Sequence, residues 1–501
     1  MGGYKEYWDL IRKYPQYQGG FIWDFVDQSL RKPGKNGTTV YGYGGDWNPY
    51  DPSDWNFCDN GLISPDRVPN PHMGEVKYWH QDIWTELVKD GLKIYNENFF
   101  RDLSAYALEW KVLCDGRVVN SGVISQLDVK PQSDVRLALP FDMDSLPAEG
   151  ELILNVAYRL KNAESLLESG HQVACAELPL REYKFAEPVV KPAMADRYTP
   201  AYSLTVCDDN EDHILVRGDK VCVDFSRKSG FITRYDVCGR KVLAEGSFIR
   251  PSFWRAQTDN DFGALSYRKS KLYNQMKIWK NPQFRLKEIS FEQGEGLVTV
   301  HTVIQMPQAQ AVLALDYVIN NAGEISVTYS FDASEGVDMP MMMRFGMRFS
   351  APSDFDRLKF YGRGPGENYC DRKASTFVGL YDQMVSDQYY PYIRPQESGT
   401  HSDLRWWHLS QISGWGVTVS SDSVFSASAL PYTVEALDEG YAKHQTHSPE
   451  VEQSEYTEVC IDKLQMGLGC IDSWKTLPHK DYLIPYADYT FRFRLSPSVK
   501  L

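Results

Sequence analysis

The sequence predicts a multidomain protein that is mainly β, with one β/α segment at its start. Its 501 residues exceed one ordinary domain. From about residue 87, apolar and polar residues alternate in short runs separated by Gly, Pro, Asn and Asp, as in half-buried strands. Residues 1–85 instead combine a helical pattern, an apolar run and a long polar loop, which together predict part of a β/α barrel.

The first segment begins with a predicted amphipathic helix that ends at Tyr14-Pro15. The apolar run Gly19–Asp24 then predicts a buried barrel strand, and a second helical stretch is expected over Glu75–Trp84. An eight-stranded barrel needs about 250 residues, so residues 1–85 predict only the C-terminal end of one. Such a partial barrel exposes strand edges and an apolar face. We therefore expect association, as a homo-oligomer or with the absent N-terminal half.

The loop that follows, up to residue 71, is dense in Trp, Tyr, Asp, Asn and Gly and has no regular period. Loops this long are usually functional or disordered, and this one is too aromatic to be disordered. An aromatic ring stacks on the apolar face of a pyranose, while Asp and Asn bind its hydroxyls. The composition therefore suits a sugar site, although such rings more often serve as packing anchors.

The rest of the chain predicts two β-sandwiches. Residues 86–186 contain alternating runs and the hairpin signal Asp115-Gly116, which favour an immunoglobulin-like sandwich. Residues 187–204 are proline-rich and without period, as in a linker. Residues 205–501 alternate throughout, which predicts one large two-sheet sandwich.

The composition of the chain limits the partners, the kinds of site and the compartments that we expect. The net charge of −14 and the pI near 5.3 exclude nucleic acid and anionic membranes as expected partners and fit a neutral ligand. Nine cysteines without CxxC pairs indicate neither a disulfide framework nor a zinc site, so buried free thiols are expected. No apolar run approaches the ~18 residues of a membrane span, and no signal peptide is recognisable. The expected compartment is cytoplasmic or periplasmic.

Several motifs carry a family resemblance. They occur in this order: GGFIWDFVDQSL (19–30), YGGD (43–46), NFCDNGL (56–62), FWRAQTDNDFG (253–263), GRGPGENYCDR (362–372), YIRPQESG (392–399) and MGLGCIDSW (466–474). Together they resemble the C-terminal portion of the β-galactosidases of glycoside hydrolase family 2. The resemblance implies the end of a TIM barrel, an immunoglobulin-like domain and a β-supersandwich of galactose-mutarotase-like type. It also implies a retaining enzyme that hydrolyses terminal β-D-galactosides.

The resemblance implies roles for four residues. Trp23 matches the tryptophan that floors the galactose pocket, and Trp474 matches one that stacks on the leaving sugar at the pocket mouth. The carbonyl of Phe57 and the side-chain oxygen of Asn60, which also contacts the sugar, match ligands of a sodium ion. The sodium site is expected to be incomplete, because a further ligand lies on earlier barrel strands. Alternatives remain: the tryptophans could be core residues, and Asn60 could hold an Asx turn with Gly61 at positive φ.

No catalytic residue is expected in this chain. The family's two reactive glutamates and its magnesium ligands lie on earlier barrel strands, so magnesium is expected only there. Residues 395–402 match a mobile loop at the pocket mouth, and the acidic groups of TDNDFG and PGENYCDR are interpreted as turn and interface residues. The carboxylates at hand are interpreted as loop-fixing and capping groups: Asp24, Asp27, Asp46, Asp59 and Glu75.

The isolated chain is therefore expected to be inactive and to contribute to a β-galactosidase only as part of the complete enzyme. An alternative is a non-catalytic carbohydrate-binding or assembly chain that complements a separate N-terminal chain. A weaker third hypothesis, epimerase activity, follows from the mutarotase-like fold alone, and fold does not determine function.

Overall fold

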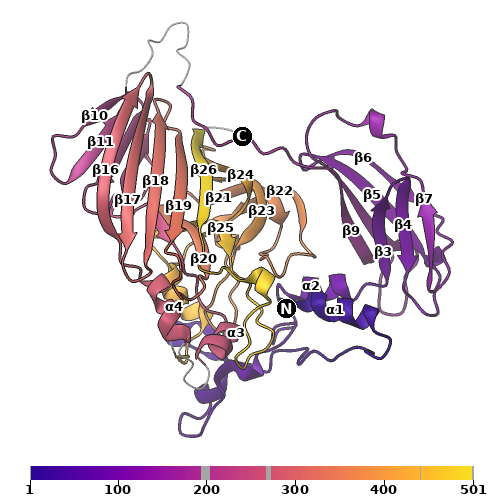
Figure 1. Ribbon diagram of the computed structural model, residues 1–501. Coiled ribbons are helices and arrows are strands. Elements are labelled where there is room, and N and C mark those ends of the chain that lie inside the picture. Colours follow the sequence, from indigo (N-terminus) through magenta and orange to yellow (C-terminus); the bar gives the residue numbers. More distant parts are fainter. Residues whose placement is uncertain (1, 193–203, 267–271, 441, 499–501) are drawn as a thin grey trace. The chain divides into compact units, whose positions relative to one another are not determined.

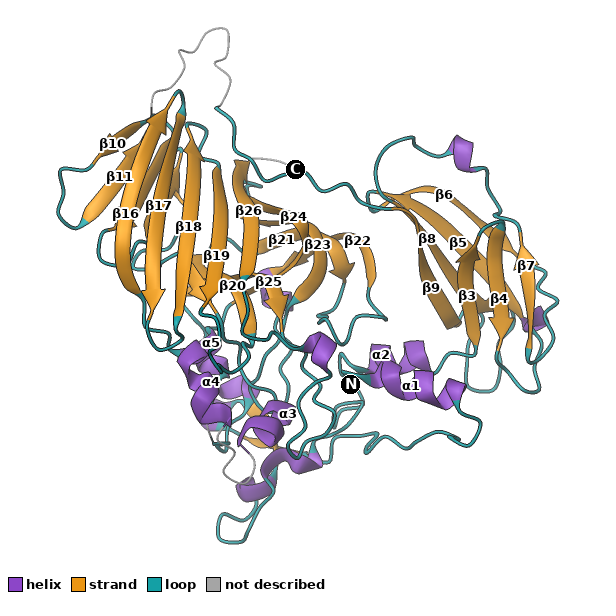
Figure 2. Ribbon diagram, viewed as in Figure 1, coloured by secondary structure: helices purple, strands orange, loops and turns teal. Residues whose placement is uncertain are grey.

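The computed structural model describes residues 2–192, 204–266, 272–440 and 442–498. The chain forms two compact units. The first comprises Met1–His72, Ala186–Lys373 and Tyr381–Leu501, and the second comprises Met73–Phe185 and Ala374–Leu380. Strands predominate in both units (Figure 2), which confirms the predicted mainly β fold class.

The second unit is a β-sandwich. After helix α2 (Met73–Trp79), antiparallel strands form one sheet in the order β3-β4-β7 and another in the order β6-β5-β8-β9 (Figure 1). Apolar residues that alternate along these strands, such as Leu92, Leu108 and Tyr158, are buried between the sheets. The strands are β3 (Ile83–Val88), β4 (Gly91–Asn96), β5 (Tyr106–Cys114), β6 (Arg117–Ile124), β7 (Ser133–Leu137), β8 (Leu152–Leu160) and β9 (Gln172–Arg181).

Local sequence signals account for two features of this unit. The predicted hairpin joins β5 to β6, and Asp115 and Gly116 both have positive φ (45° and 79°), as the favoured two-residue turn requires. The predicted helix over Glu75–Trp84 is only half right, because α2 ends at Trp79. Trp84 lies in β3, whose pairing with β4 outweighs the helical pattern.

The first unit contains the large sandwich. Strands β10 to β14 form one sheet in chain order, and a twelve-stranded sheet follows the path β15-β20-β25-β24-β26-β19-β18-β17-β16, with β23 and β21 branching from β24. A large apolar core joins the sheets, where for example Phe225 packs on Tyr317 with ring centroids 5.2 Å apart. Strand β22 (Phe377–Met384) pairs with β21 and is the twelfth strand of this sheet.

The smaller sheet has β10 (Thr205–Cys207), β11 (His213–Arg217), β12 (Val221–Ser226), β13 (Ile232–Val237) and β14 (Arg240–Lys241). The larger has β15 (Arg250–Ser252), β16 (Arg285–Gly294), β17 (Leu297–Met306), β18 (Ala311–Asn320), β19 (Ile325–Ala333), β20 (Arg344–Pro352), β21 (Arg357–Gly364), β23 (His401–Ser410), β24 (Gly416–Leu430), β25 (Tyr456–Gln465) and β26 (Tyr489–Ser498). The helices are α3 (Asp259–Asp261), α4 (Leu272–Lys280) and α5 (Val434–Leu437).

Residues 2–72 also belong to the first unit. The predicted N-terminal helix is confirmed as α1 (Tyr4–Lys13), and a small hairpin pairs β1 (Leu30–Pro33) with β2 (Thr39–Gly42). The predicted buried strand Gly19–Asp24 is wrong, since the segment is not a strand and the side chain of Phe21 is fully exposed. A strand needs a hydrogen-bonded neighbour, and in the described residues the chain finds one only from Asp24 onward.

The remaining predictions concern the cysteines, the linker, the domain boundaries and membrane-spanning helices. All nine cysteines lie in the described ranges and are free thiols, but only Cys460 and Cys470 are buried, while Cys207 and Cys238 are exposed. The predicted linker 187–204 lies largely outside the described residues, because 193–203 are not among them. The domain boundaries remain predictions. Among the described residues, no helix is both long and apolar enough to cross a membrane.

Candidate functional site

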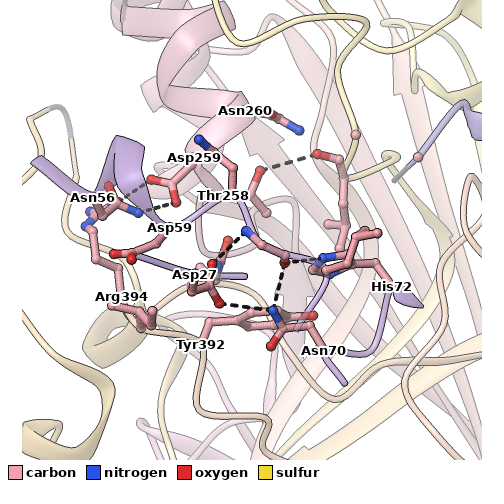
Figure 3. A pocket seen from close by; sticks show the side chains of 18 of the residues that line it. Asp27, Asn56, Asp59, Asn70, His72, Thr258, Asp259, Asn260, Tyr392 and Arg394 are labelled. Atoms are coloured by element: carbon pink, nitrogen blue, oxygen red, sulfur yellow. Dashed lines mark hydrogen bonds and ion pairs between the residues drawn. The ribbon is translucent and has the colours of Figure 1, made fainter. Parts of the chain in front are cut away.

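A cavity of about 660 Å³ opens in the first unit. Segments far apart in the sequence line it, mainly residues within 22–72, 258–260, 390–397 and 468–473. Figure 3 shows carboxylates, amides and an arginine gathered around it. The cavity thus combines hydrogen-bond donors and acceptors with aromatic side chains, the combination that a polyhydroxylated ligand requires.

One wall of the cavity is a short parallel pairing of residues 24–27 with residues 60–63. The amide of Leu62 donates to the carbonyl of Asp24 (3.1 Å), and the amide of Asp27 donates to the carbonyl of Ile63 (3.0 Å). Val26 and Ile63 form the bridge between the two segments. Of the predicted strand Gly19–Asp24, only Asp24 takes part in this pairing. The pairing places the NFCDNG motif beside the Trp-Asp motif.

Gly61 is the centre of a buried hydrogen-bond network in this wall. Its amide donates to Asp27 Oδ1 (2.7 Å), and its carbonyl accepts from Asn70 Nδ2 (2.8 Å) and from His72 Nε2 (3.0 Å). Asn70 also donates to Asp27 Oδ2 (3.1 Å) and accepts from the hydroxyl of Tyr390 (2.6 Å). Asp27 therefore fixes the backbone next to Asn60 and holds it against the large sandwich.

The titratable groups of this wall are perturbed by burial. Burial raises the pKa of Asp27, although the bond from Gly61 opposes the shift. Burial likewise lowers the pKa of His72 to about 3, so its ring is neutral at pH 7. Asp59, which accepts from the hydroxyl of Ser29, has its pKa raised to about 7 by burial, with a smaller contribution from Asp27.

Asp259, another lining residue of the cavity, has three donors around its carboxylate. Its carboxylate accepts from Asn56 Nδ2 (2.6 Å) and from Arg394 Nη1 (2.6 Å) (Figure 3). Lys443 Nζ lies 2.7 Å away from it. Burial alone would raise the pKa of Asp259, but Lys443 and Arg394 outweigh it and hold the pKa far below its usual range. Asp259 is therefore a carboxylate throughout the neutral pH range.

The loop that contains residues 390–399 is held by a second buried ion pair. Glu367 binds Arg372 and also accepts from the hydroxyls of Tyr392 and Ser398 and from the amide of Gly399 (2.8 Å). Glu367 thus fixes a turn, as the interpretation of the acidic groups in PGENYCDR expects, and the interface role of these groups stays a prediction. The loop borders the cavity through Tyr392 and Arg394.

The structure brings the predicted site residues near one another. Trp23 and Asn60 line the same cavity, and the side chain of Trp23 is 76% exposed, so it is not a core residue. Trp474 is 53% exposed and directly follows the lining residue Ser473. Its ring centroid lies 6.1 Å from that of Phe57, at 54°, which forms an aromatic pair beside the cavity.

Phe57 and Asn60 are in direct contact, because the side-chain amide of Asn60 donates to the carbonyl oxygen of Phe57. The alternative of an Asx turn with Gly61 at positive φ is wrong, because the φ of Gly61 is not positive. Glycine is required here by space: a Cβ on Gly61 would lie 2.1 Å from the amide nitrogen of Asp27. In the described ranges, no three His, Cys, Asp or Glu side chains come together as a metal site.

The carboxylates that we interpreted as loop-fixing groups do fix loops. Asp46 accepts from the amide of Tyr43 (2.9 Å) and from His447 (2.8 Å), and Glu75 accepts from the amide of Ser375 (3.2 Å). Asp24 accepts from the side chain of its near neighbour Gln28. Asp27 and Asp59 act as described above.

Several residues that line the cavity had no predicted binding role, among them Asn70, His72, Asp259 and Arg394. Asp259 and Arg394 lie within motifs that carried the family resemblance, so for these two residues the motifs contained the signal. The spacing of the motifs could not place these residues in one cavity, because the contacts join positions more than 300 residues apart.

Family models match three successive parts of the chain. The TIM barrel domain of glycosyl hydrolases family 2 matches residues 1–85, β-galactosidase domain 4 matches 92–181, and the β-galactosidase small chain matches 217–495. The small-chain match alone covers more than half of the chain.

Curated relatives are similar along almost the whole chain. A β-galactosidase of Priestia megaterium is 34% identical over 99% of this chain and 46% of its own length. One of Streptococcus thermophilus is 31% identical over 99% of this chain and 46% of its own length. The chain thus spans about half the length of the curated relatives it matches.

A solved galactose 1-epimerase from Lactobacillus acidophilus covers 59% of this chain and 98% of its own, at 8% identity and a TM-score of 0.31. That likeness is too weak to bear on function. The family models, in contrast, follow one another in order along the sequence. The chain therefore belongs to the β-galactosidases of glycoside hydrolase family 2, and it corresponds to a C-terminal portion of such an enzyme.

Proposed function

We propose that this chain forms the C-terminal part of a retaining β-galactosidase that hydrolyses terminal β-D-galactosides. One observation carries the proposal: Trp23 and Asn60, from the first motifs, border the same cavity as residues 472–473, which lead to Trp474. In this proposal the indole of Trp23 lies against the apolar face of galactose, and Trp474 stacks on the leaving group. Both side chains are exposed and thus available for stacking.

The two reactive carboxyl groups are assigned, in this proposal, to barrel strands that precede residue 1. A retaining glycosidase needs an acid and a nucleophile about 5 Å apart across the scissile bond. Asp27, Asp259 and Glu367 already serve as acceptors of several hydrogen bonds each, which supports positioning roles for them. The chain then supplies the binding walls of the site without running the reaction alone.

We assign a sodium ion to the carbonyl oxygen of Phe57 and the side-chain oxygen of Asn60. Neutral oxygens suit a hard cation, and the side chain of Asn60 lies next to the carbonyl of Phe57, to which its amide nitrogen donates. Two ligands are fewer than such an ion takes, so the remaining ligands would come from earlier barrel strands. The bound ion would attract sugar hydroxyls, while this chain's own residues fix its position through Gly61. Magnesium is assigned to the earlier strands only.

The alternative function is a non-catalytic carbohydrate-binding or assembly chain that complements a separate N-terminal chain. The observation that favours association is a set of exposed apolar side chains in and after α1. Tyr7, Leu10, Phe21 and Phe25 are 45% or more exposed. Such a surface fits the earlier strands of a barrel, or a second copy of this chain, better than it fits solvent.

A direct test measures hydrolysis of a chromogenic β-galactoside by the purified chain, alone and combined with the N-terminal part of a family enzyme. The expected result is no turnover by the chain alone and turnover by the combination. Turnover by the chain alone would contradict the assignment of the carboxyl pair to other strands. Failure of the combination to turn over any β-galactoside, with binding of galactose retained, would favour the non-catalytic alternative.

A further inference from the structure

The turn Thr258–Gly263 lies between two loops that the sequence places far apart. Its fold is fixed from within the large sandwich. Asp261 is fully buried and pairs with the equally buried Arg255, whose Nη1 lies 2.6 Å from Asp261 Oδ2. Asp261 also accepts from the amide of Thr258 (2.8 Å), and Arg255 donates to the carbonyl of Gly467 (3.0 Å). The turn is therefore a rigid point from which neighbouring loops can be held.

The first of these loops is the NFCDNG segment. Asn56 is 4% exposed, and its side-chain amide donates to Asp259 Oδ2 (2.6 Å) while its carbonyl oxygen accepts from Lys443 (3.1 Å). Asp259 in turn is fixed by Arg394 and Lys443. The next residue along the chain is Phe57. The position of the Phe57 ring and carbonyl thus depends on a hydrogen bond from Asn56 to a charged acceptor on the turn.

The second loop carries Trp474. The hydroxyl of Ser473 donates to Asn260 Oδ1 (2.9 Å). Gly263 allows this approach, because a Cβ there would lie 2.0 Å from the carbonyl oxygen of Ser473. Asp472 then fixes the indole-bearing residue by accepting from the amide of Trp474 (2.8 Å). Two adjacent side chains of the turn, Asp259 and Asn260, therefore each hold one loop.

We propose that Asp259 is a positioning residue that, together with Asn260, sets the Phe57–Trp474 aromatic pair at the mouth of the cavity. The proposal rests on the proposed function for its consequence, which is selectivity for the leaving group. The two rings come from segments more than 400 residues apart, and in the described part of the chain neither segment belongs to a strand that could pair with the other. Their 6.1 Å separation is set through the turn. An aromatic leaving group would stack against this pair, whereas a small alkyl group would not.

The carboxylate of Asp259 suits this role for an electrostatic reason. About a third of its side chain, 34%, remains exposed, so it reaches the cavity surface while it binds three donors. In Asp259→Asn one of the two acceptor oxygens becomes a donor that faces other donors. Hydrogen bonds to charged acceptors are among the stronger ones, so the loop of Asn56 should loosen first.

Hydrogen–deuterium exchange of the chain tests the positioning role without any activity. In Asp259→Asn, amides of residues 55–61 should exchange roughly 10-fold faster, the size expected for losing one charged hydrogen bond. Asn56→Ala removes the same bond from the other side and should give the same result. In Asn260→Ala the increase should instead fall on residues 472–476.

Glu439→Gln is the matched control. It removes the same charge and a partner of the same Arg394, but in the described chain Glu439 otherwise accepts only from the amide of His444. Exchange over residues 55–61 should stay at the wild-type rate. Unchanged exchange in both Asp259→Asn and Asn56→Ala, or an equal increase in Glu439→Gln, would overturn the proposal.

The consequence for selectivity is tested in the enzyme assembled with its N-terminal part. The readout is the ratio of kcat/KM for an aryl β-galactoside to kcat/KM for a small alkyl β-galactoside. Asp259→Asn should lower this ratio about 3- to 10-fold, the value of a lost aromatic contact, and Glu439→Gln should leave it unchanged. If Asp259 had a merely structural role, the substitution would lower kcat/KM for both substrates by the same factor, and this result would overturn the proposal. If the wild-type assembly hydrolyses no galactoside, the proposed function fails, whereas the exchange experiment still decides the positioning role.

Discussion

Replacing Gly61 with alanine should open the wall of the cavity locally. The new Cβ would lie 2.1 Å from the amide nitrogen of Asp27, where ordinary contact begins at 3.4 Å, so the two segments must separate by about 1.3 Å (3.4 minus 2.1). The atoms in the way are backbone and cannot rotate aside. Bonds of 2.7 to 3.1 Å then fail, namely those from Gly61 to Asp27, from Asp27 to Ile63 and from Leu62 to Asp24. Their loss amounts to about 3–5 kcal/mol of local stability.

The assay is hydrogen exchange of residues 57–71, with Gly20→Ala as the matched control. A Cβ on Gly20 meets nothing within 4 Å, so the same substitution there should leave exchange unchanged. Exchange in Gly61→Ala should be faster by at least 100-fold, because 1.4 kcal/mol corresponds to about a factor of ten. If the two variants exchange at the same rate, the close approach of the backbone does not determine this wall, and the reasoning fails.

Three further predictions concern binding, pH and the anchor of the turn. Trp23→Ala should weaken galactose binding by the assembled enzyme about 3- to 10-fold, as measured by calorimetry. Phe100→Ala, which replaces an exposed ring that does not line the cavity, should leave binding unchanged. Burial lowers the pKa of His401 to about 4, so its neutral ring stabilises the fold above pH 6.5 and this stability is lost as the pH falls towards 4. Between pH 7.5 and 5.5, the free energy of unfolding in urea should therefore fall by ~1.3 kcal/mol less in His401→Gln than in the wild type. An equal fall in both proteins would contradict the assignment. Asp261→Asn leaves Arg255 buried without its charged partner and should lower the free energy of unfolding, measured by thermal unfolding, by ~3–5 kcal/mol. Glu245→Gln, in the exposed pair with Lys241, should lower it by less than ~1 kcal/mol.

Local signals in the sequence determined much of the β structure. Alternation predicted strands such as β18 and β19, because their side chains face the core and the outside in turn. The Asp115-Gly116 pair predicted its hairpin, because these residues tolerate positive φ. Such features depend on neighbours within a few residues, which is the range over which sequence patterns carry information.

The run Gly19–Asp24 shows the limit of that reasoning. Its apolar composition is that of a barrel strand, but a strand forms only where a partner offers hydrogen bonds, and the described chain offers one only from Asp24 onward. Gly61 shows a second limit. The sequence marks a required glycine, while only the structure shows that the reason is the backbone of Asp27 rather than a positive φ.

The sequence by itself determined the family, the strand content and the motifs from which the site is built. The tertiary structure alone decided which of these motifs meet: Asn70 with Tyr390, Asn56 with Asp259, and Phe57 with Trp474. The physical reason is that each of these contacts depends on the folding of the large sandwich, which brings together segments hundreds of residues apart. No local preference of the chain encodes such a distance.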